Sequence, residues 1–409
     1  EENFWQPLKG WWNDMKIRGS YGSLGNQVMD DLGNFPYLAT YGTNSSYNYL
    51  INGSKPVIVK APGLVAPDFT WETVTQMDFG FDASFLNNRL TGTFDWYRRN
   101  TKDMLVAGAT LPATLGASVP KSNSADMKTI GWELSLGWND RLENGFSYWV
   151  KGVLSDYQAT ITKYAGNDAG FYSQSDGDGK YYVGQKIGEI WGYHSNGLFQ
   201  SDDEAATIDQ SELYAGKWGA GDVKYEDLDN DGKITKGEET IYNPGDKSII
   251  GNKTPRYQFG ITVGFDYKNF DFEMFWQGTG KRDYMLSGAQ FWGFTSQWDV
   301  PYTPALDYWT ETNTDAYFPR PGWQNGGNRV TSDRYLQSAA YGRLKNLTVG
   351  YTIPKNLTTK WGISRLRLYV TGENLLTITP LNDAFDPETL GGMTYPINRK
   401  VAIGLNLTL

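Results

Sequence analysis

One stretch of the sequence carries acidic residues at a spacing that suits a hard metal ion. In DLDNDGKITKGE, residues 227–238, aspartates stand at positions 1, 3 and 5, a glycine at 6 and a glutamate at 12, which is the spacing of a calcium loop. Carboxylates this close repel one another unless a cation lies among them, and an all-oxygen site suits Ca²⁺ first and Mg²⁺ second. The alternative is a solvated acidic turn between strands. The predicted metal ligands are Asp227, Asp229, Asp231, the carbonyl group of Lys233, and Glu238.

Other residues that could do chemistry are few. The sequence has no cysteine, which excludes thiol nucleophiles and cysteine–metal sites. It has a single histidine, His194, which is too few for a histidine-rich zinc site. A structural or partner-facing role is expected for His194. A second acidic stretch, SDGDGKYY at 175–182, contains Asp176 and Asp178 but no ligand at the twelfth position, and it is interpreted as a turn.

A long aromatic segment spans residues 284–323 and is punctuated by prolines. Its rings could stack on sugar rings, because flat apolar faces with polar edges suit carbohydrate. The favoured alternative is that they pack the loop onto itself or onto a partner protein, since a long ordered loop needs a core of its own. The candidate substrate or partner contacts are Trp292, Trp298, Tyr302, Tyr308, Trp309 and Trp323.

The composition limits the class of protein that positions these residues. The 409 residues carry a net charge of −9 and a pI near 4.9, which argues against nucleic acid as a partner. Aromatic residues make up 15% of the chain, charged residues only 20%, and there are 47 glycines. This bias predicts an all-β protein.

Strict alternation of apolar and polar residues recurs along the chain and predicts about ten or eleven strands. The terminal stretch VAIGLNLTL, residues 401–409, alternates in the same way. In a closed barrel this last strand would pair with the first, which explains a hydrophobic end. Four hairpins are expected, pairing 77–85 with 90–97, 130–138 with 146–154, 257–267 with 270–276, and 347–354 with 366–375.

The connections alternate between tight turns and long loops, which is typical of a transmembrane antiparallel β-barrel. The apolar face of each strand is then predicted to contact lipid, with aromatic residues near the strand ends. Residues 160–254 and 278–338 are expected to be long extracellular loops. Acidic residues on the opposite face are attributed to a wet lumen and not to a glycosidase pair: Asp95, Glu133, Asp266, Asp271 and Glu273.

Ten motifs, in order along the chain, resemble the C-terminal portion of the SusC/RagA-type TonB-dependent outer-membrane transporters. They are MKIRGSYGSLGNQ (15–27), WETVTQMDFGFD (71–82), RLTGTFDWYRRNTKDML (89–105), GWELSLGW (131–138), IGEIWGYHSNGLFQS (187–201), GDVKYEDLDNDGKIT (221–235), IGNKTPRYQFGI (250–261), YGRLKNLTVGYTIP (341–354), LYVTGENLLTIT (368–379) and YPINRKVAIGLNLTL (395–409).

The resemblance implies that residues 1–409 form the C-terminal half of a roughly 22-strand barrel. The plug, the segment that contacts TonB and the first half of the barrel would belong to another chain or have been cut away. The implied function is import of oligosaccharides or peptides across the outer membrane of a Gram-negative bacterium, together with a SusD-like surface lipoprotein and without catalysis. The runner-up is a soluble all-β carbohydrate-binding or hydrolase domain, and a third reading is a passive porin-like channel.

Overall fold

The fold is taken from a computed structural model, which describes residues 7, 11–26, 35, 37–44, 50–67, 69–108, 111–172, 181–390, 395 and 397–409. The acidic turn predicted around Asp176 and Asp178 lies outside the described residues.

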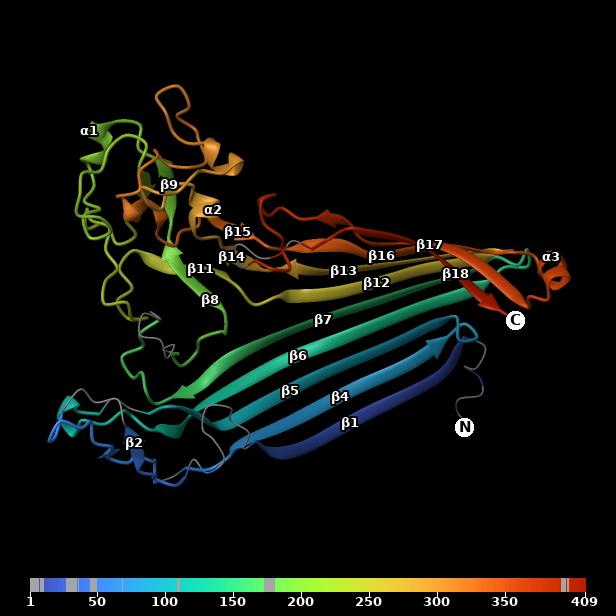
Figure 1. The fold of residues 1–409 in the computed structure, drawn as a ribbon, viewed down its shortest axis with the longest axis horizontal. Helices are drawn as coiled ribbons and strands as arrows, with labels where there is room; N and C mark the ends of the chain where they lie inside the picture. Colours follow the sequence, from blue (N-terminus) through green and yellow to red (C-terminus); the bar gives the residue numbers. More distant parts are fainter. Residues whose placement is uncertain are drawn as a thin grey trace.

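The main element is a ten-stranded antiparallel sheet whose strands lie side by side in chain order, from blue β1 to red β18 (Figure 1). Its strands are β1 (Trp12–Asn26), β4 (Glu72–Phe85), β5 (Leu90–Ala107), β6 (Lys121–Arg141), β7 (Ser147–Tyr164), β12 (Arg256–Tyr267), β13 (Phe270–Lys281), β16 (Tyr341–Thr352), β17 (Arg365–Ile378) and β18 (Lys400–Thr408).

The four expected hairpins are confirmed as β4–β5, β6–β7, β12–β13 and β16–β17. Their tight turns gather at one end of the sheet, at the right of Figure 1, and the long connections gather at the other. The β12–β13 turn needs only Lys268 and Asn269, and Lys268 adopts a positive φ of 55°. The sorting of loops by length is therefore as the sequence predicts.

The strand register sets the two faces of the sheet. Phe94 on β5 lies opposite Phe81 on β4 and Leu134 on β6, so the apolar residues of three strands share one face. That face, called the outward face below, continues to β18, where Ile403 is 84% exposed. Large apolar side chains left exposed across a whole sheet indicate a surface covered by an apolar medium or partner.

The opposite face, called the inward face below, uses glycine where a neighbouring strand lays a large side chain across the sheet. The indole of Trp149 lies over Gly264, where an added Cβ would come within 2.2 Å of the ring. The phenol of Tyr97 covers Gly131 in the same way. These glycines are needed for close packing, because any side chain there would displace an aromatic ring.

The long connections form small structures of their own. Their pairs are β8 (Glu189–Tyr193) with β11 (Lys247–Asn252), β9 (Ser195–Leu198) with β10 (Val223–Tyr225), β14 (Asp283–Met285) with β15 (Leu336–Ser338), and β2 (Gly42–Asn44) with β3 (Ile58–Lys60). The short helices are α1 (Asp202–Ala205), α2 (Ala289–Trp292) and α3 (Lys355–Thr358), with 3₁₀ turns η2 (Ala113–Leu115), η3 (Thr303–Leu306), η4 (Gly326–Arg329) and η5 (Thr359–Trp361).

The largest buried core lies in these connections and not in the sheet. Tyr225, Phe291 and Tyr335 are fully buried and belong to one hydrophobic cluster, which also includes Leu381 and Phe385 from the connection before β18. Residues from 193–234, 284–339 and 381–390 therefore fold together into one unit, called the cap below, at the long-loop end of the sheet (Figure 1).

The two outer strands of the sheet pair on one side only among the described residues. β1 pairs with β4, and β18 pairs with β17. The closure that the sequence analysis expects for the final strand is thus not formed within the described chain and stays a prediction. Among the helices of the described residues, none has the length and apolar character needed to cross a membrane.

Candidate functional site

The acidic loop predicted to bind metal lies on the cap and brings three carboxylates together. Carboxylate oxygens of Asp227, Asp229 and Asp246 lie within 4.8 Å of one another. Of the four predicted carboxylate ligands, Asp227 and Asp229 belong to this group. Asp246 is its third member, and the spacing within the loop did not identify it.

Asp231 and Glu238 are not members of the three-carboxylate group, and both have local contacts of their own. Asp231 accepts a hydrogen bond from the backbone N–H of Lys233 at 2.8 Å, so its side chain closes a local turn. The backbone N–H of Glu238 donates to the carbonyl of Asn243, within the loop from Gly237 to Gly245, whose φ angles are both positive. This loop returns the chain to the cluster at Asp246.

Asp246 is fully buried and holds the loop in place. One of its carboxylate oxygens accepts the backbone N–H of Leu228 and the other accepts that of Thr235, both at 2.7 Å. Asp227 likewise accepts the N–H of Gly232 at 2.8 Å. The arrangement gathers carboxylate oxygens, which are the kind of ligand atom that Ca²⁺ prefers.

The electrostatics of the two loop aspartates differ. Desolvation is the largest effect on Asp229 and raises its pKa, and repulsion from Asp231, Asp246 and Asp227 raises it further. Desolvation also acts to raise the pKa of Asp227, but backbone hydrogen bonds, that of Gly232 foremost, outweigh it, and the pKa is lowered. The repulsion within the cluster therefore appears as a raised pKa of Asp229.

The six aromatic candidates separate into buried and exposed residues. Trp292 and Trp309 are buried in the cap core, in agreement with the favoured packing role. Tyr308 packs against that core. The exposed candidates are Trp298, Tyr302 and Trp323.

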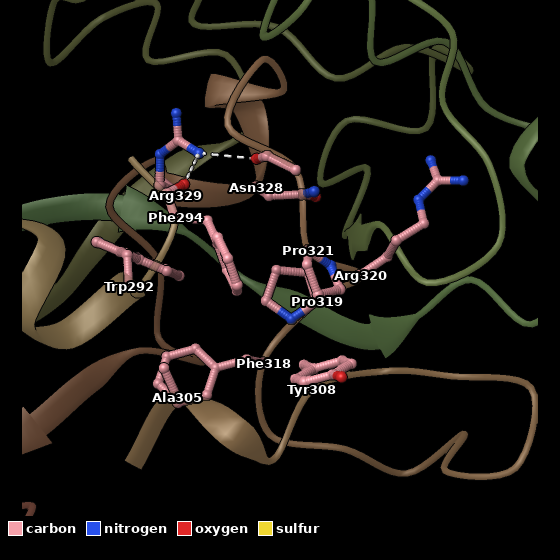
Figure 2. A pocket seen from close by; sticks show the side chains of 11 residues that line it. Trp292, Phe294, Ala305, Tyr308, Phe318, Pro319, Arg320, Pro321, Asn328 and Arg329 are labelled. Carbon is pink, nitrogen blue, oxygen red and sulfur yellow. Dashed lines mark hydrogen bonds between the residues drawn. The ribbon is translucent and has the colours of Figure 1, made fainter. Parts of the chain in front are cut away.

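Two of the candidates, Trp292 and Tyr308, line a cavity that is too small for a sugar. Figure 2 shows Trp292, Phe318 and Tyr308 around it, with Arg329 donating to the carbonyl of Phe294. Its volume is about 20 Å³, which is room for a water molecule. Contacts with a substrate at this place are therefore limited to the exposed rings.

A larger recess lies where the two long loops meet. It has a volume of about 430 Å³, and Trp191, Glu189 and Lys247 from β8 and β11 line it together with Tyr284 from β14. The volume falls in the range of small-molecule sites. No local spacing in the sequence indicates this recess, because its lining residues come from separate stretches between Tyr172 and Thr331.

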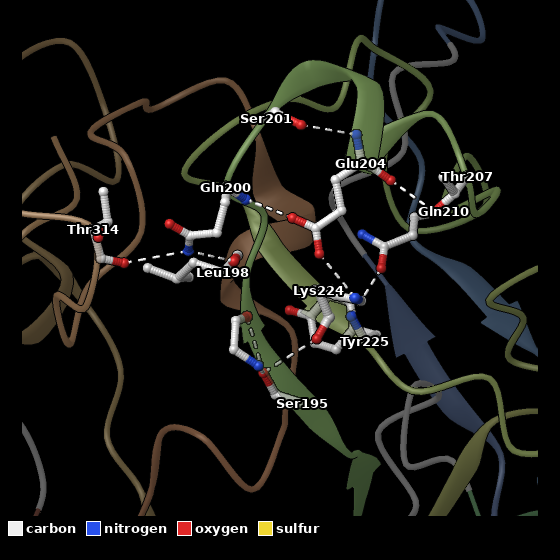
Figure 3. A network of polar contacts seen from close by, with 11 residues as sticks. Ser195, Leu198, Gln200, Ser201, Glu204, Thr207, Gln210, Lys224, Tyr225 and Thr314 are labelled. Atoms are coloured by element: carbon white, nitrogen blue, oxygen red, sulfur yellow. Dashed lines mark hydrogen bonds and ion pairs between the residues drawn. The ribbon is translucent and has the colours of Figure 1, made fainter. Parts of the chain in front are cut away.

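Polar contacts fix the cap. In Figure 3, Glu204 accepts the backbone N–H of Gln200 at 2.7 Å and the ammonium of Lys224 at 2.8 Å. The side chain of Gln200 donates to the carbonyl of Thr314, across the two long loops. The side-chain amide of Gln210 donates a hydrogen bond to the carbonyl of Val223 and accepts one from the backbone N–H of Tyr225, both on β10.

His194 joins the same two loops. Its Nδ1 lies 2.7 Å from a carboxylate oxygen of Asp333, and its Nε2 lies 2.7 Å from the hydroxyl of Ser248 on β11. The other oxygen of Asp333 accepts the backbone N–H of Ser195. These contacts agree with the structural role expected for His194.

Ion pairs occupy the inward face of the sheet. Arg18 on β1 contacts both Asp82 and Asp95 at 2.8 Å, and Arg367 pairs with Asp271. Two of the acidic residues considered for catalysis are thus held by arginine, as a polar lumen wall would require.

The sequence of this chain is similar to proteins of one known family. The sequence model of the family described as TonB dependent receptor-like, beta-barrel matches residues 4–375. TonB-dependent receptor P3 of Formosa agariphila is 29% identical over 96% of this chain and 39% of its own length. TonB-dependent receptor SusC of Bacteroides thetaiotaomicron is 26% identical over 100% of the chain and 38% of its own length.

Solved structures agree on the fold. The RagAB peptide importer in its closed-closed state superimposes with a TM-score of 0.74 at 22% identity, covering 97% of this chain and 41% of the neighbour. The chain thus spans about two fifths of the length of the proteins it matches. The chain belongs to the family of TonB-dependent receptor-like β-barrels.

Proposed function

We propose that the chain is the C-terminal half of a barrel that imports oligosaccharides or peptides across the outer membrane, with energy from TonB. Barrels of this family lie in the outer membrane. The observation that carries the proposal is the sheet itself, which has an apolar outward face, an ion-paired inward face and all its long loops at one end. That arrangement suits a lipid-embedded wall around a wet lumen.

TonB-dependent receptors are transporters and not enzymes, which confirms the prediction that the chain is not an enzyme. Family membership also favours the barrel over the soluble carbohydrate-binding or hydrolase domain. A passive channel differs from the proposed importer in needing neither a plug nor TonB.

The partners are part of the proposal. The plug, the remaining strands and the TonB contact would come from the portion that the matched relatives have and this chain does not span. A SusD-like lipoprotein would close over the cap, where Trp298, Tyr302 and Trp323 are exposed. Exposed aromatic rings on a rigid support suit both a protein contact and stacking on a glycan.

The acidic cluster is proposed as a Ca²⁺ site of the cap. Asp227, Asp229 and Asp246 would supply side-chain oxygens, and the ion would relieve the repulsion that raises the pKa of Asp229. Calcium would then stabilise the cap and not take part in chemistry.

Uptake by cells tests the import function. Cells that carry the assembled transporter with Trp298→Ala and Trp323→Ala should lose uptake of a labelled oligosaccharide or of a labelled peptide pool, and the class affected identifies the substrate. Tyr242→Ala, which removes another exposed ring of the cap region, is the matched control. Uptake of both labels that persists in cells lacking TonB would contradict the importer and favour the passive channel.

A further inference from the structure

The outward face of β5 and β6 changes from apolar to cationic toward the long loops. Phe94 lies opposite Leu134, and the next outward pair is Trp96 opposite Trp132. Beyond the two tryptophans, the next outward residue of β5 is Arg98. The aromatic pair therefore marks the boundary between an apolar zone and a charged one.

Four cations share this boundary, and the register places each on the outward face. Arg98 lies opposite Met77 and Ile130, Lys102 opposite Thr73, and Lys128 opposite Asn100 and Thr160. Thr160 also forms a bridge with Lys186. Directly paired residues of antiparallel strands point to the same side. The outer basic patch is defined as Arg98, Lys102, Lys128 and Lys186.

No carboxylate neutralises the outer basic patch within the described part of the chain, where none of its four side chains takes part in an ion pair. The only polar contact of Arg98 there is a hydrogen bond from its Nε to Asn100 at 3.3 Å. Two carboxylates of the neighbouring strands have other partners: Asp156 pairs with Arg256, and Asp126 accepts the backbone N–H of Asp103.

Other cations of the sheet have acidic partners. Arg18 and Arg367 each pair with at least one aspartate. Cations gathered without anions repel one another, so a face that brings Arg98 and Lys128 to adjacent positions is stabilised when an anion binds between them. Asp156, which lies opposite the outward Trp132, is likewise paired, with Arg256. The four cations of the outer basic patch have no such partner in the described part of the chain, so the anion that would neutralise them comes from outside it.

The depth of the patch identifies that anion. Along β5, Arg98 stands about 7 Å beyond Trp96, and Lys102 about 20 Å beyond it, at ~3.3 Å per residue. Tryptophans of a barrel lie at the boundary between hydrocarbon and headgroups. The outer basic patch is therefore at headgroup depth, on the side of the long loops, which is the outer leaflet.

We propose that the outer basic patch binds the phosphate groups of anionic lipid headgroups in the outer leaflet. Guanidinium and ammonium groups are the side chains that bind phosphate most strongly. Their attraction to a phosphate is stronger beside a bilayer than in bulk water, because less water surrounds the two charges. The inference rests on the proposed lipid contact of the outward face. Its consequence is a layer of lipid fixed to the wall beneath the cap.

The test uses the assembled transporter that contains this chain, purified in a neutral detergent. Arg98→Gln with Lys128→Gln removes two charges of the patch. Arg99→Gln is the matched control, because Arg99 is the next residue of the same strand, faces inward and donates to Gln76. Retained lipid is measured by native mass spectrometry after incubation with diphosphorylated lipid A or with its phosphate-free form.

The unaltered transporter and Arg99→Gln should retain the phosphorylated lipid about tenfold better than the phosphate-free form, and the double variant should lose that preference. The double variant Arg98→Lys with Lys128→Arg, which retains both charges, should keep the preference for the phosphorylated lipid. This result would show that the loss in the glutamine variant comes from the missing charges and not from misfolding. Equal retention of both lipids by the unaltered transporter, or an unchanged preference in the double variant, would overturn the proposal while leaving lipid contact intact. Retention of neither lipid would overturn the lipid contact as well.

Discussion

The carboxylate of Asp246 is fully buried, yet it lies beside two aspartates that are partly or fully exposed. A buried carboxylate is costly unless it is hydrogen-bonded, and Asp246 accepts two backbone N–H groups. Its burial orders the loop, and the charge it adds is what a cation would neutralise. The loop spacing could not reveal this, because Asp246 reaches the cluster only after the loop from Gly237 to Gly245.

Calcium affinity should follow the cluster seen in the structure. Asp229→Asn should weaken Ca²⁺ binding about tenfold, because it removes one of three clustered charges without disturbing the bonds of Asp246. Glu238→Gln should leave the affinity unchanged, because Glu238 stands apart from the group. Isothermal titration of the two variants with Ca²⁺ makes the comparison. A large loss with Glu238→Gln and none with Asp229→Asn would restore the ligand set that the spacing predicts.

The same site should weaken as the pH falls. Ca²⁺ binds the ionised carboxylates, and a group with a raised pKa takes up a proton at a higher pH than an ordinary aspartate. Asp229 has a raised pKa from desolvation and from its acidic neighbours, so it is the first to be protonated as the pH is lowered from 7. Titrations at successive pH values should show affinity falling with pH, and Asp229→Asn should flatten the profile. Affinity that rises toward acid would exclude these carboxylates as ligands.

At the scale of the strand, the alternation of side chains was sufficient to predict the hairpins and the faces. Each residue of a strand is one step of a period-2 pattern, so the sequence states directly which side chains share a face. The cap could not be predicted in this way. Its core joins Tyr225, Phe291 and Phe385, which come from three different connections, and no local period links them.

The face assignment predicts unequal penalties for a charge. Leu134→Arg should destabilise the folded barrel by ~2–4 kcal/mol if it lies near the bilayer midplane, because the guanidinium would face lipid. Ser135→Arg should cost much less, because Ser135 lies on the inward face opposite Thr93 and Val153. Folding titrations of the assembled barrel in liposomes measure both. Equal penalties would remove the basis for the two faces.

The glycines of the inward face predict another difference. Gly264→Ala should destabilise the sheet by ~1–3 kcal/mol, because the added methyl group meets the indole of Trp149 at 2.2 Å. Gly152→Ala, on the outward face of the neighbouring strand, should cost less, because no atom lies within 4 Å of its new Cβ. The same folding titrations compare the two variants. A neutral Gly264→Ala would show that Trp149 moves freely and does not brace the wall.

For the whole molecule, the described sheet has two outer strands, β1 and β18, each paired on one side only. Unpaired backbone groups in hydrocarbon cost several kcal/mol each, so a wall with two open edges needs further strands in a bilayer. The lipoprotein proposed above would make a second contact, with the exposed aromatic rings of the cap. We therefore propose that this chain is one part of a larger assembly.

Purification in mild detergent tests that claim most directly. An affinity-tagged form of this chain, expressed with the rest of its barrel and with candidate surface lipoproteins, should be recovered with strands that pair at β1 and β18, with the plug, and with a SusD-like lipoprotein. Recovery of the chain alone, as a stable folded barrel of 46.0 kDa, would contradict the account.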